Sequence, residues 1–256
     1  MRILSWNVWD ENKKSAEDIA QFICAHNADV VCLQEVATHL WKELRPLLSG
    51  VYECHTARDM KSAGRGPCML MFLSRTPVIQ SAAMRTRSKK GWRSWFSLWK
   101  QVEEHLEFQR MDIETGDGRI RIMNAHLEVG TSPCNRLNQF KYVLRRCKRR
   151  GVIKRSIVVG DLNIFGDGWY PRLVGWLWHG FASKWLWLNE REEFAKICKK
   201  RGLKNIFEGQ TTFSIAGSEF QLDHILVPEK AAVLAHAVIE DMCGSDHKAI
   251  VADIEI

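Results

Sequence analysis

The sequence Ser-Ile-Val-Val-Gly-Asp-Leu-Asn, at positions 156–163, places a carboxylate and a carboxamide directly after a run of branched apolar residues. The apolar residues 157–159 predict a strand that is buried on both faces. Asp161 and Asn163 are separated by one residue, so their side chains point to the same side if the chain stays extended. An α/β sheet commonly binds its ligand at such a strand end, although Asp and Asn also occur there as simple turn residues.

Similar polar side chains occur at the ends of other predicted strands. They are Asn7, Glu35, His126, Asp223, Asp246 and His247. Taken singly, each has a structural explanation, because an Asn can cap a turn and a single His is more often a hydrogen-bonded core residue than a catalyst. Together with Asp161 and Asn163 they make eight polar residues at the edges of apolar strands, and this number favours a shared site.

These residue types suit the hydrolysis of a phosphate ester. Glu35 and Asp246, with Asn7, offer hard oxygen ligands that favour Mg²⁺ or Mn²⁺, and the sequence has no Cys/His cluster that would favour zinc. A carboxylate beside an imidazole, here Asp223 and His247, fixes the imidazole tautomer and stabilises its charged form. A second histidine and a carboxamide can donate hydrogen bonds to phosphate oxygens. The set therefore predicts metal-assisted attack of water on a phosphate ester.

The elements that must position these residues begin as strand, helix and strand. Strand-like sequence at Arg2–Val8 precedes a helix capped by Ser15, with Asp18 three residues later, and a strand at Asp29–Leu33. Further strands are predicted at Cys68–Leu73, His105–Ile113, Arg119–Asn124, Phe220–Val227 and Ala249–Ile256, and further helices after Ser132 and Asn189. Because strands alternate with helices in some places and form a hairpin in another, we expect an α/β fold with a mixed sheet, or two sheets, covered by helices.

Composition narrows the classes of protein to consider. No linker rich in Gly, Ser or Pro divides the 256 residues, which favours a single domain over residues 1–256. The chain starts in strand-like sequence without a signal-peptide pattern or long apolar run, so we expect a cytoplasmic protein. The eight cysteines are scattered without a Cys-x-x-Cys pair and are expected to be reduced thiols. We expect a monomer without an obligate protein partner.

Six short motifs carry a resemblance to a known family. They are Ser-Trp-Asn (5–7), Leu-Gln-Glu (33–35), Asn-Ala-His-Leu-Glu (124–128), Gly-Asp-Leu-Asn (160–163), Leu-Asp-His-Ile-Leu (222–226) and Gly-Ser-Asp-His (244–247). In type and order they resemble the motifs of the endonuclease/exonuclease/phosphatase superfamily, which is deoxyribonuclease I-like. The resemblance implies a four-layer α/β sandwich of two packed mixed sheets flanked by helices, with the site at one rim. It also implies that Glu35 binds the metal, helped by Asn7 and Asp246.

The resemblance implies catalytic roles for five further residues. Asp161 and Asn163 would orient the attacking water and the phosphate. His247, paired with Asp223, would act as general base or would stabilise the charged transition state. His126 would contact a phosphate oxygen. Whether Asp161 or His247 takes the proton of the water stays open.

Two departures from the pattern separate the chain from some members of the family. Exonuclease III-like members carry an Asp two residues after the first Asn, where this chain has Trp9, with Asp10 one position further. They also have a Tyr at the position of His126. Both differences favour the deoxyribonuclease I, sphingomyelinase and tyrosyl-DNA phosphodiesterase branches. The run His-Leu-Glu (126–128), with Arg-Leu-Asn-Gln (136–139), most resembles the last two. We interpret Arg136 and Gln139 as structural residues on the helix that supports the neighbouring loop.

The substrate class is predicted from charge and from two aromatic segments. A net charge of +7 and a pI near 9.0 favour a polyanionic partner, which is nucleic acid or an anionic membrane surface. A basic aromatic insert at about 85–100 includes Lys89, Lys90 and Arg93, and such residues suit the phosphates and bases of frayed or single-stranded nucleic acid. The same composition also suits a segment that lies at a membrane interface. A Trp-rich segment at about 169–188 includes Trp176 and Trp178, and its apolar character suits a membrane surface or a local core.

We therefore favour a Mg²⁺- or Mn²⁺-dependent phosphodiester hydrolase that is a nuclease or a DNA-end-processing phosphodiesterase. The alternative is a phospholipid phosphodiesterase or phosphatase at the membrane surface, sphingomyelinase-like or directed at phosphoinositides. A non-enzymatic binding module on the same fold is disfavoured, because the complete catalytic set is present. Salt-sensitive nucleic-acid binding supports the first hypothesis, and sedimentation with liposomes supports the second.

Overall fold

The computed structural model describes residues 1–62, 66–85, 107–116, 118–129, 131–147, 155–166, 189–215 and 217–256. Nearly all of the predicted basic aromatic insert and the whole Trp-rich segment lie outside these ranges. The predicted substrate contacts in those two segments, Lys89, Lys90, Arg93, Trp176 and Trp178, are therefore outside the described residues.

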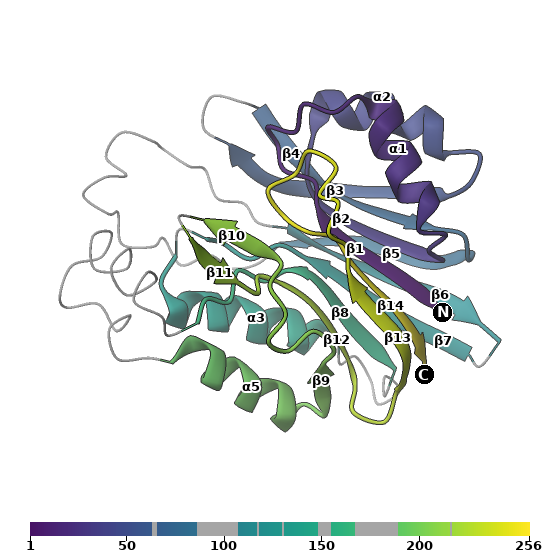
Figure 1. The fold of residues 1–256 in the computed structure, drawn as a ribbon. Helices are drawn as coiled ribbons and strands as arrows, with labels where there is room; N and C mark the ends of the chain where they lie inside the picture. The colour runs from purple at the N-terminus through teal and green to yellow at the C-terminus, as the bar shows by residue number, and fades with distance from the viewer. Residues whose placement is uncertain are drawn as a thin grey trace.

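Two mixed six-stranded sheets form the centre of the molecule (Figure 1). The first has the order β13-β14-β1-β2-β4-β3, with β1 Arg2–Asn7, β2 Val30–Ala37, β3 Glu53–Ser62, β4 Gly66–Ser74, β13 Ala232–Val238 and β14 Ile250–Glu255. The second has the order β5-β6-β7-β8-β12-β9, with β5 Val78–Arg85, β6 Glu107–Thr115, β7 Gly118–Ala125, β8 Ser156–Asp161, β9 Leu203–Asn205 and β12 Asp223–Pro228. One pair in each sheet is parallel, β1 with β2 and β7 with β8, and the other pairs are antiparallel. A separate hairpin is formed by β10 (Phe213–Ile215) and β11 (Ser218–Phe220).

Helices cover the outer faces of both sheets, which gives four layers (Figure 1). The helices α1 (Ala16–Ala25) and α2 (Thr38–Leu48) pack on the first sheet, and α3 (Pro133–Cys147) and α5 (Glu190–Lys200) pack on the second. Three buried apolar clusters fill the spaces between these layers. The first lies between α1, α2 and the first sheet, the second lies between the two sheets, and the third lies between the second sheet and α3 and α5. The predicted four-layer α/β sandwich is confirmed.

The continuous apolar runs form strands because both of their faces are buried. In β8, Ile157 and Val159 face the cluster between the sheets, whereas Val158 faces the cluster under α3 and α5. In β1, Ile3 faces the space between the sheets and Leu4 faces α1 and α2. Successive side chains of a strand point to opposite faces, so a strand in a middle layer needs apolar residues at consecutive positions.

The predicted helix starts are confirmed by capping hydrogen bonds. Each capping side chain accepts the N–H of the residue three positions later: Ser15 that of Asp18 at 3.1 Å, Asn189 that of Glu192 at 3.0 Å and Ser132 that of Asn135 at 3.3 Å. These bonds satisfy backbone donors that have no partner inside the first turn of a helix.

Two predicted strands have wrong boundaries. The strand predicted at Phe220–Val227 is interrupted, because the hydroxyl of Thr212 accepts the N–H groups of Leu222 and Asp223 at 3.0 and 3.1 Å and thereby separates β11 from β12. The second strand of the chain continues to Ala37 rather than ending at Leu33, because a β-bulge after Leu33 lets the pairing with β4 resume at Val36. The helix α2 and the strands β3, β5, β9, β10 and β13 were not among the predicted elements.

The structure contains free cysteines and, within the described residues, no membrane-spanning helix. All eight cysteines are free, as predicted. Burial raises the pKa of Cys147 and of Cys198 to about 12, so these two thiols stay protonated and inert. Within the described residues, no helix has both the length and the apolar character needed to span a membrane.

A buried amide network joins the two sheets. Gln34 of β2 donates from Nε2 to Oδ1 of Asn124 in β7 at 2.8 Å. The Nδ2 group of Asn124 lies 3.0 Å from Oε1 of Gln109 and 3.1 Å from the carbonyl oxygens of Leu33 and Met71. Because polar groups at this depth must be hydrogen-bonded, the network fixes how the sheets align at one end of the sandwich.

Gly160 allows β7 and β8 to approach closely just before Asp161. Its φ angle is +129°, and a Cβ atom there would lie 2.1 Å from the carbonyl oxygen of Ala125. Gly160→Ala is expected to lower the free energy of unfolding by at least about 3 kcal/mol in urea, because Ala125 would have to move and the backbone would be strained. The matched control, Gly50→Ala, has nothing within 4 Å of the added Cβ and is expected to change stability by less than about 1 kcal/mol. Equal unfolding midpoints for the two variants would contradict this account.

His224 is a buried histidine on β12 that is held neutral. Its ring lies 5.0 Å from the ring of Phe194, and its Nδ1 lies 3.1 Å from Nε2 of Gln221. Burial, reinforced by the positive charge of Arg191, lowers the pKa of His224 to about 3. A histidine in the unfolded chain has a pKa of ~6.5, so lowering the pH below that value favours the unfolded state, which binds the proton more readily. The stability that depends on a neutral His224 is therefore complete above pH ~6.5 and is lost as the pH falls toward the pKa of the folded state.

Between pH 7 and pH 5, the wild type is expected to lose about 2 kcal/mol more unfolding free energy than His224→Gln, which has no proton to bind on unfolding. Chemical denaturation at both pH values measures the difference. His39→Gln, at an exposed position on α2, serves as the control and should leave the pH dependence of the wild type unchanged. The same pH dependence in His224→Gln as in the wild type would show that His224 is not the group responsible.

Candidate active site

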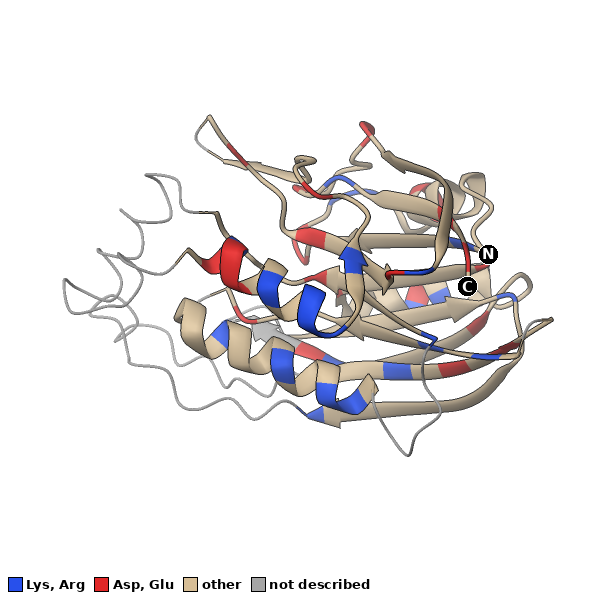
Figure 2. Cartoon of the chain, turned by 90° about the horizontal axis from the view of Figure 1, so that it is seen from below, with Lys and Arg blue, Asp and Glu red and all other residues tan. Residues whose placement is uncertain are grey.

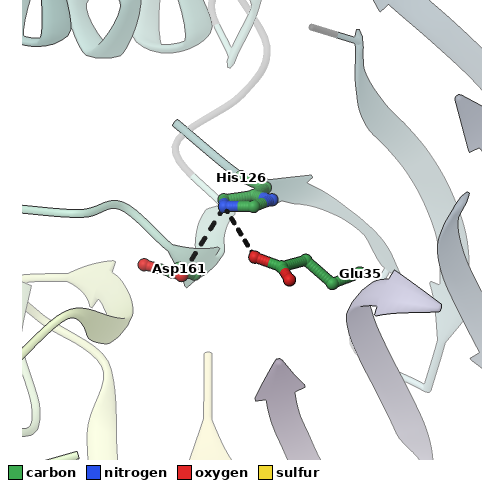
Figure 3. A group of neighbouring side chains, drawn as sticks. All are labelled: Glu35, His126 and Asp161. Atoms are coloured by element: carbon green, nitrogen blue, oxygen red, sulfur yellow. Dashed lines mark ion pairs between the residues drawn. The ribbon is translucent and has the colours of Figure 1, made fainter. Parts of the chain in front are cut away.

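The predicted site residues lie where the carboxyl ends of the two parallel strand pairs meet. Asn7 is the last residue of β1, Glu35 lies in the bulge of β2, His126 follows β7 and Asp161 ends β8. Asp223 begins β12 and is paired in register with Asp161. Figure 3 shows the side chains of Glu35, His126 and Asp161 pointing toward one another.

Asn7 connects the two sheets at this rim. Its Nδ2 donates to Oε1 of Glu35 and to Oδ2 of Asp161, both at 3.0 Å, and its Oδ1 accepts the N–H of Trp9 at 3.0 Å. The amide nitrogen therefore faces the two carboxylates, while the amide oxygen is held by the backbone. In this arrangement Asn7 holds two like charges close together, and its role as a metal ligand stays a prediction.

His126 lies between three carboxylates. Its Nδ1 is 3.0 Å from Oδ1 of Asp59, and its Nε2 is 3.5 Å from Oε1 of Glu35 and 3.6 Å from Oδ2 of Asp161 (Figure 3). Burial by itself lowers the pKa of His126, but the negative charges of Asp59, Asp161 and Glu35 outweigh it and raise the pKa to about 10. The imidazole is therefore protonated, and Nε2 presents an N–H to the centre of the site.

Asp59, on β3, is a site residue that the sequence did not reveal. Its carboxylate contacts His126 on one side, and its Oδ2 accepts the backbone N–H of Glu35 at 2.8 Å on the other. It is buried, with 4% of its surface exposed. The surrounding sequence, Glu-Cys-His-Thr-Ala-Arg-Asp-Met-Lys-Ser, is mostly polar, so no apolar pattern marked a strand there, and only its position in space identifies Asp59.

The predicted pair of Asp223 and His247 is formed. The Nδ1 of His247 lies 2.8 Å from Oδ2 of Asp223, and its Nε2 lies 3.8 Å from Oδ2 of Asp161 and 4.0 Å from Oδ1 of Asp246. Burial lowers the pKa of His247, but Asp223, Asp161 and Asp246 outweigh that effect and raise the pKa to about 10. The hydroxyl of Ser245 accepts the N–H of His247 at 3.0 Å and fixes this loop.

Asp161 occupies the centre, between the two histidines. Besides its bond from Asn7, it accepts the N–H of Asn163 on Oδ1 at 3.0 Å. Burial raises its pKa, while the positive charges of His247 and His126 lower it in part. The side chain of Asn163 donates from Nδ2 to the carbonyl oxygen of Leu127 at 2.8 Å, which ties it to the loop after His126.

Two of these residues have left-handed backbone conformations. The φ angles of Glu35 and Asn163 are 53° and 51°, which is uncommon for residues other than glycine. The backbone N–H of Glu35 is held by Asp59 and that of Asn163 by Asp161. Strained conformations of this kind persist where neighbouring bonds fix them, and they are frequent at functional sites.

Arg136 supports the loop that carries His126. It is fully buried and donates to the carbonyl oxygens of Glu128, Val129 and Thr131 at 2.9, 3.1 and 3.4 Å. It also forms a bidentate ion pair with Glu190 at the start of α5, at 2.8 and 3.0 Å. These contacts, with the side-chain bonds of Gln139 to Glu128, agree with the structural interpretation of both residues.

Arg136 and Glu190 also hold Phe165 beside the start of α5. The Oε2 of Glu190 accepts the N–H of Phe165 at 3.2 Å, and the guanidinium of Arg136 lies 5.2 Å from the centre of the Phe165 ring. The chain after Asn163 and the start of α5 are therefore held beside each other, although they are separated by more than twenty positions in the sequence.

The oxygen donors at the rim fit a divalent cation. Burial raises the pKa values of Glu35, Asp161 and Asp246, so a nearby positive charge would favour the ionised forms of these carboxylates. Within the described residues, Oδ1 of Asp246 and Oδ1 of Asp223 are buried without a hydrogen-bond partner. Carboxylate oxygens of this kind are the ligands that Mg²⁺ and Mn²⁺ prefer.

The comparisons with known proteins agree with this geometry. No curated protein sequence matches the chain. A solved endonuclease/exonuclease/phosphatase structure from Beutenbergia cavernae DSM 12333 superposes with a TM-score of 0.72 at 17% identity, covering 100% of this chain and 71% of that one. A mannosyl-6-phosphatase from Bacteroides thetaiotaomicron VPI-5482 gives a TM-score of 0.67 at 16% identity, with 100% of both chains covered. TDP2 from D. rerio, complexed with a single-strand DNA product, gives 0.65 at 16% identity, covering 100% of this chain and 99% of that one.

At these identities the solved structures establish the fold, and the sequence model establishes the family. The model described as the Endonuclease/Exonuclease/phosphatase family matches residues 4–247, which includes all six motifs. The chain therefore belongs to the endonuclease/exonuclease/phosphatase family, whose members hydrolyse phosphate esters.

Proposed function

We propose that the protein is a divalent-metal-dependent phosphodiesterase that acts on nucleic acid, as a nuclease or as an enzyme that processes DNA ends. The observation that carries the proposal is the position of Asp161 between two imidazoles, 3.6 Å from His126 and 3.8 Å from His247. A proton acceptor flanked by two N–H donors suits the attack of water on an anionic phosphate.

Each side chain has a proposed task in that reaction. Asp161 accepts the proton of the attacking water, because both of its oxygens are held at the centre of the rim by Asn7 and Asn163. His126 and His247 donate from Nε2 to phosphate oxygens, since their Nδ1 atoms are occupied by Asp59 and Asp223. Each carboxylate thereby fixes the tautomer and the orientation of its imidazole.

The proposed cation is Mg²⁺ or Mn²⁺, held by Glu35 and Asp246 with Asn7. When bound, it would act as a Lewis acid on the phosphate and compensate the negative charge of the rim. The hard oxygen donors support this assignment, as does Oδ1 of Asp246, which is buried without a hydrogen bond from the described residues.

Nucleic acid is the substrate class that the overall charge favours. The net charge of +7 attracts a polyanion. A structural neighbour, D. rerio TDP2, was solved with a single-strand DNA product in a fold that matches this whole chain. The predicted contacts Lys89, Lys90 and Arg93 would add cations near the substrate, whereas Trp176 and Trp178 would suit the membrane alternative.

A substrate panel tests the proposal. Plasmid, single-stranded DNA, RNA, tyrosyl-DNA, sphingomyelin, phosphoinositides and a sugar phosphate are each incubated with the protein, with Mg²⁺ or with EDTA. We expect hydrolysis of nucleic acid that EDTA abolishes, and a loss of at least about a thousandfold in Asp161→Ala and His247→Ala. Asp253→Ala, on β14 and outside the set of site residues, serves as the control. Hydrolysis of only the lipids or only the sugar phosphate would contradict the assigned substrate, and full activity of Asp161→Ala would contradict the assigned chemistry.

Asp59 gives a separate test of the positioning of His126 and Glu35. Asp59→Asn keeps the shape but removes the charge that faces His126, so we expect kcat to fall about 10- to 100-fold with little change in KM. The control is Glu53→Gln on the same strand, whose carboxylate also contacts a histidine, His55, at 2.8 Å but at the surface. An unchanged kcat in Asp59→Asn would show that Asp59 does not position the catalytic residues.

A further inference from the structure

The helices α3 and α5, which pack on the second sheet, both carry cationic residues. The two helices pack side by side through Phe140 and Phe194, whose ring centres are 4.8 Å apart. Figure 2 shows Lys and Arg on both helices toward their carboxyl ends. We name this surface the α3/α5 basic face, and it consists of Lys141, Arg145, Arg146, Lys196, Lys199 and Lys200.

Of the cations on this face, only Lys196 is neutralised by acidic residues of the two helices. The sequence of α3 contains no Asp or Glu, and the three acids of α5 are confined to its first turn. One of those acids, Glu190, is buried against Arg136, and the other two pair with Lys196 at 2.7 and 3.0 Å. Among the described residues, Arg145, Lys199 and Lys200 form no ion pair.

The spacing of the cations makes them repel one another. Lys141 and Arg145 are four positions apart on α3, and like charges at that spacing destabilise a helix. Attraction to the negative end of the helix dipole accounts for cations in the last turn, but Lys141 lies more than one turn before the end of α3. A polyanion bound across both helices would relieve this repulsion.

The composition of the face favours nucleic acid over a membrane. A membrane-binding surface combines cations with exposed apolar side chains that enter the lipid. None of the exposed large apolar residues in the described chain lies on α3 or α5. The only aromatic ring among the outward positions of α3, that of Tyr142, is covered by Arg146, which lies 5.0 Å from its centre and donates to its hydroxyl at 2.8 Å. This surface can therefore contact phosphates, but it offers no free aromatic ring on which bases could stack.

We propose that the α3/α5 basic face binds the phosphate backbone of nucleic acid, away from the catalytic rim. The face belongs to the outer helices, whereas the catalytic residues lie at the strand ends, so the two surfaces would contact different parts of one polymer. The identity of the polyanion rests on the proposed function, and the binding itself needs no catalysis.

The test compares two triple variants of the full chain. Arg145→Gln, Lys199→Gln and Lys200→Gln remove three exposed cations from the basic face. The control, Lys42→Gln, Arg119→Gln and Lys230→Gln, removes the same residue types from exposed positions elsewhere. Binding to a fluorescent duplex oligonucleotide is measured in EDTA over a series of salt concentrations, with thermal unfolding as the check on folding.

The basic-face variant is expected to bind at least about fivefold more weakly than the control, with the slope of log affinity against log salt reduced by about 2 to 3. Equal affinities and slopes for the two variants would overturn the proposal. The proposal would also be overturned if the basic-face variant lost binding to vesicles of phosphatidylcholine and phosphatidylserine but bound the oligonucleotide as well as the control did. If the basic-face variant alone unfolds, single substitutions at Arg145 and Lys200 are compared instead by the same slopes.

Failure of this proposal is distinguishable from failure of the proposed function. A wild type that cleaves nucleic acid while both triple variants bind equally well overturns only the basic face. A wild type that binds the oligonucleotide through Arg145, Lys199 and Lys200, but hydrolyses no nucleic acid in the substrate panel, supports the basic face and overturns the proposed substrate.

Discussion

Several carboxylates are buried together at the rim of the candidate active site, and the rest of the site is arranged around the repulsion between their negative charges. Glu35, Asp59 and Asp161 all lie within 3.6 Å of the His126 ring. Buried carboxylates without compensation become protonated or destabilise the fold. The protonated imidazole and the amide of Asn7 supply part of that compensation, and the proposed divalent cation would supply more.

The site is divided between the two sheets. The first sheet contributes Asn7, Glu35 and Asp59, and the second contributes Asp161 and Asp223. Each sheet has one parallel pair that ends at the same rim, so the two halves meet only because the sheets pack face to face. The buried amide network centred on Asn124 fixes that packing next to the site. The chemistry therefore depends on the interface between the sheets as much as on any single loop.

Sequence patterns predicted the elements whose signals are local. The strand at 157–159 is a continuous apolar run, and Ser15 begins its helix through a bond to the third residue after it. The helix α2 lacked such signals, because Ala37 provides no capping side chain and Pro46 lies inside the helix. The strand β13 has mostly exposed side chains, so its sequence does not show the pattern of a buried strand.

For the site, the six motifs identified residues that the fold brings into one network of contacts. That network runs from Glu35 through Asn7 and Asp161 to His247. Asp59 was not predicted, because its role follows from β3 being the edge strand beside β4, and strand order is not encoded in any short pattern. The orientation of the Asn7 amide was likewise not predicted, because it is set by a hydrogen bond from the backbone N–H of Trp9 to Oδ1 of Asn7, which no sequence motif indicates.

The junction between Phe165 and Glu190 has a consequence for how this protein can diverge. Phe165 and Glu190 lie beside each other, and Arg136 contacts both of them. Where two points of a chain are held together, lengthening the sequence between them costs little, since the entropy of closing a flexible loop grows only with the logarithm of its length. The length of the sequence between Phe165 and Glu190 can therefore change through natural variation or engineering while Arg136 keeps these two residues in place.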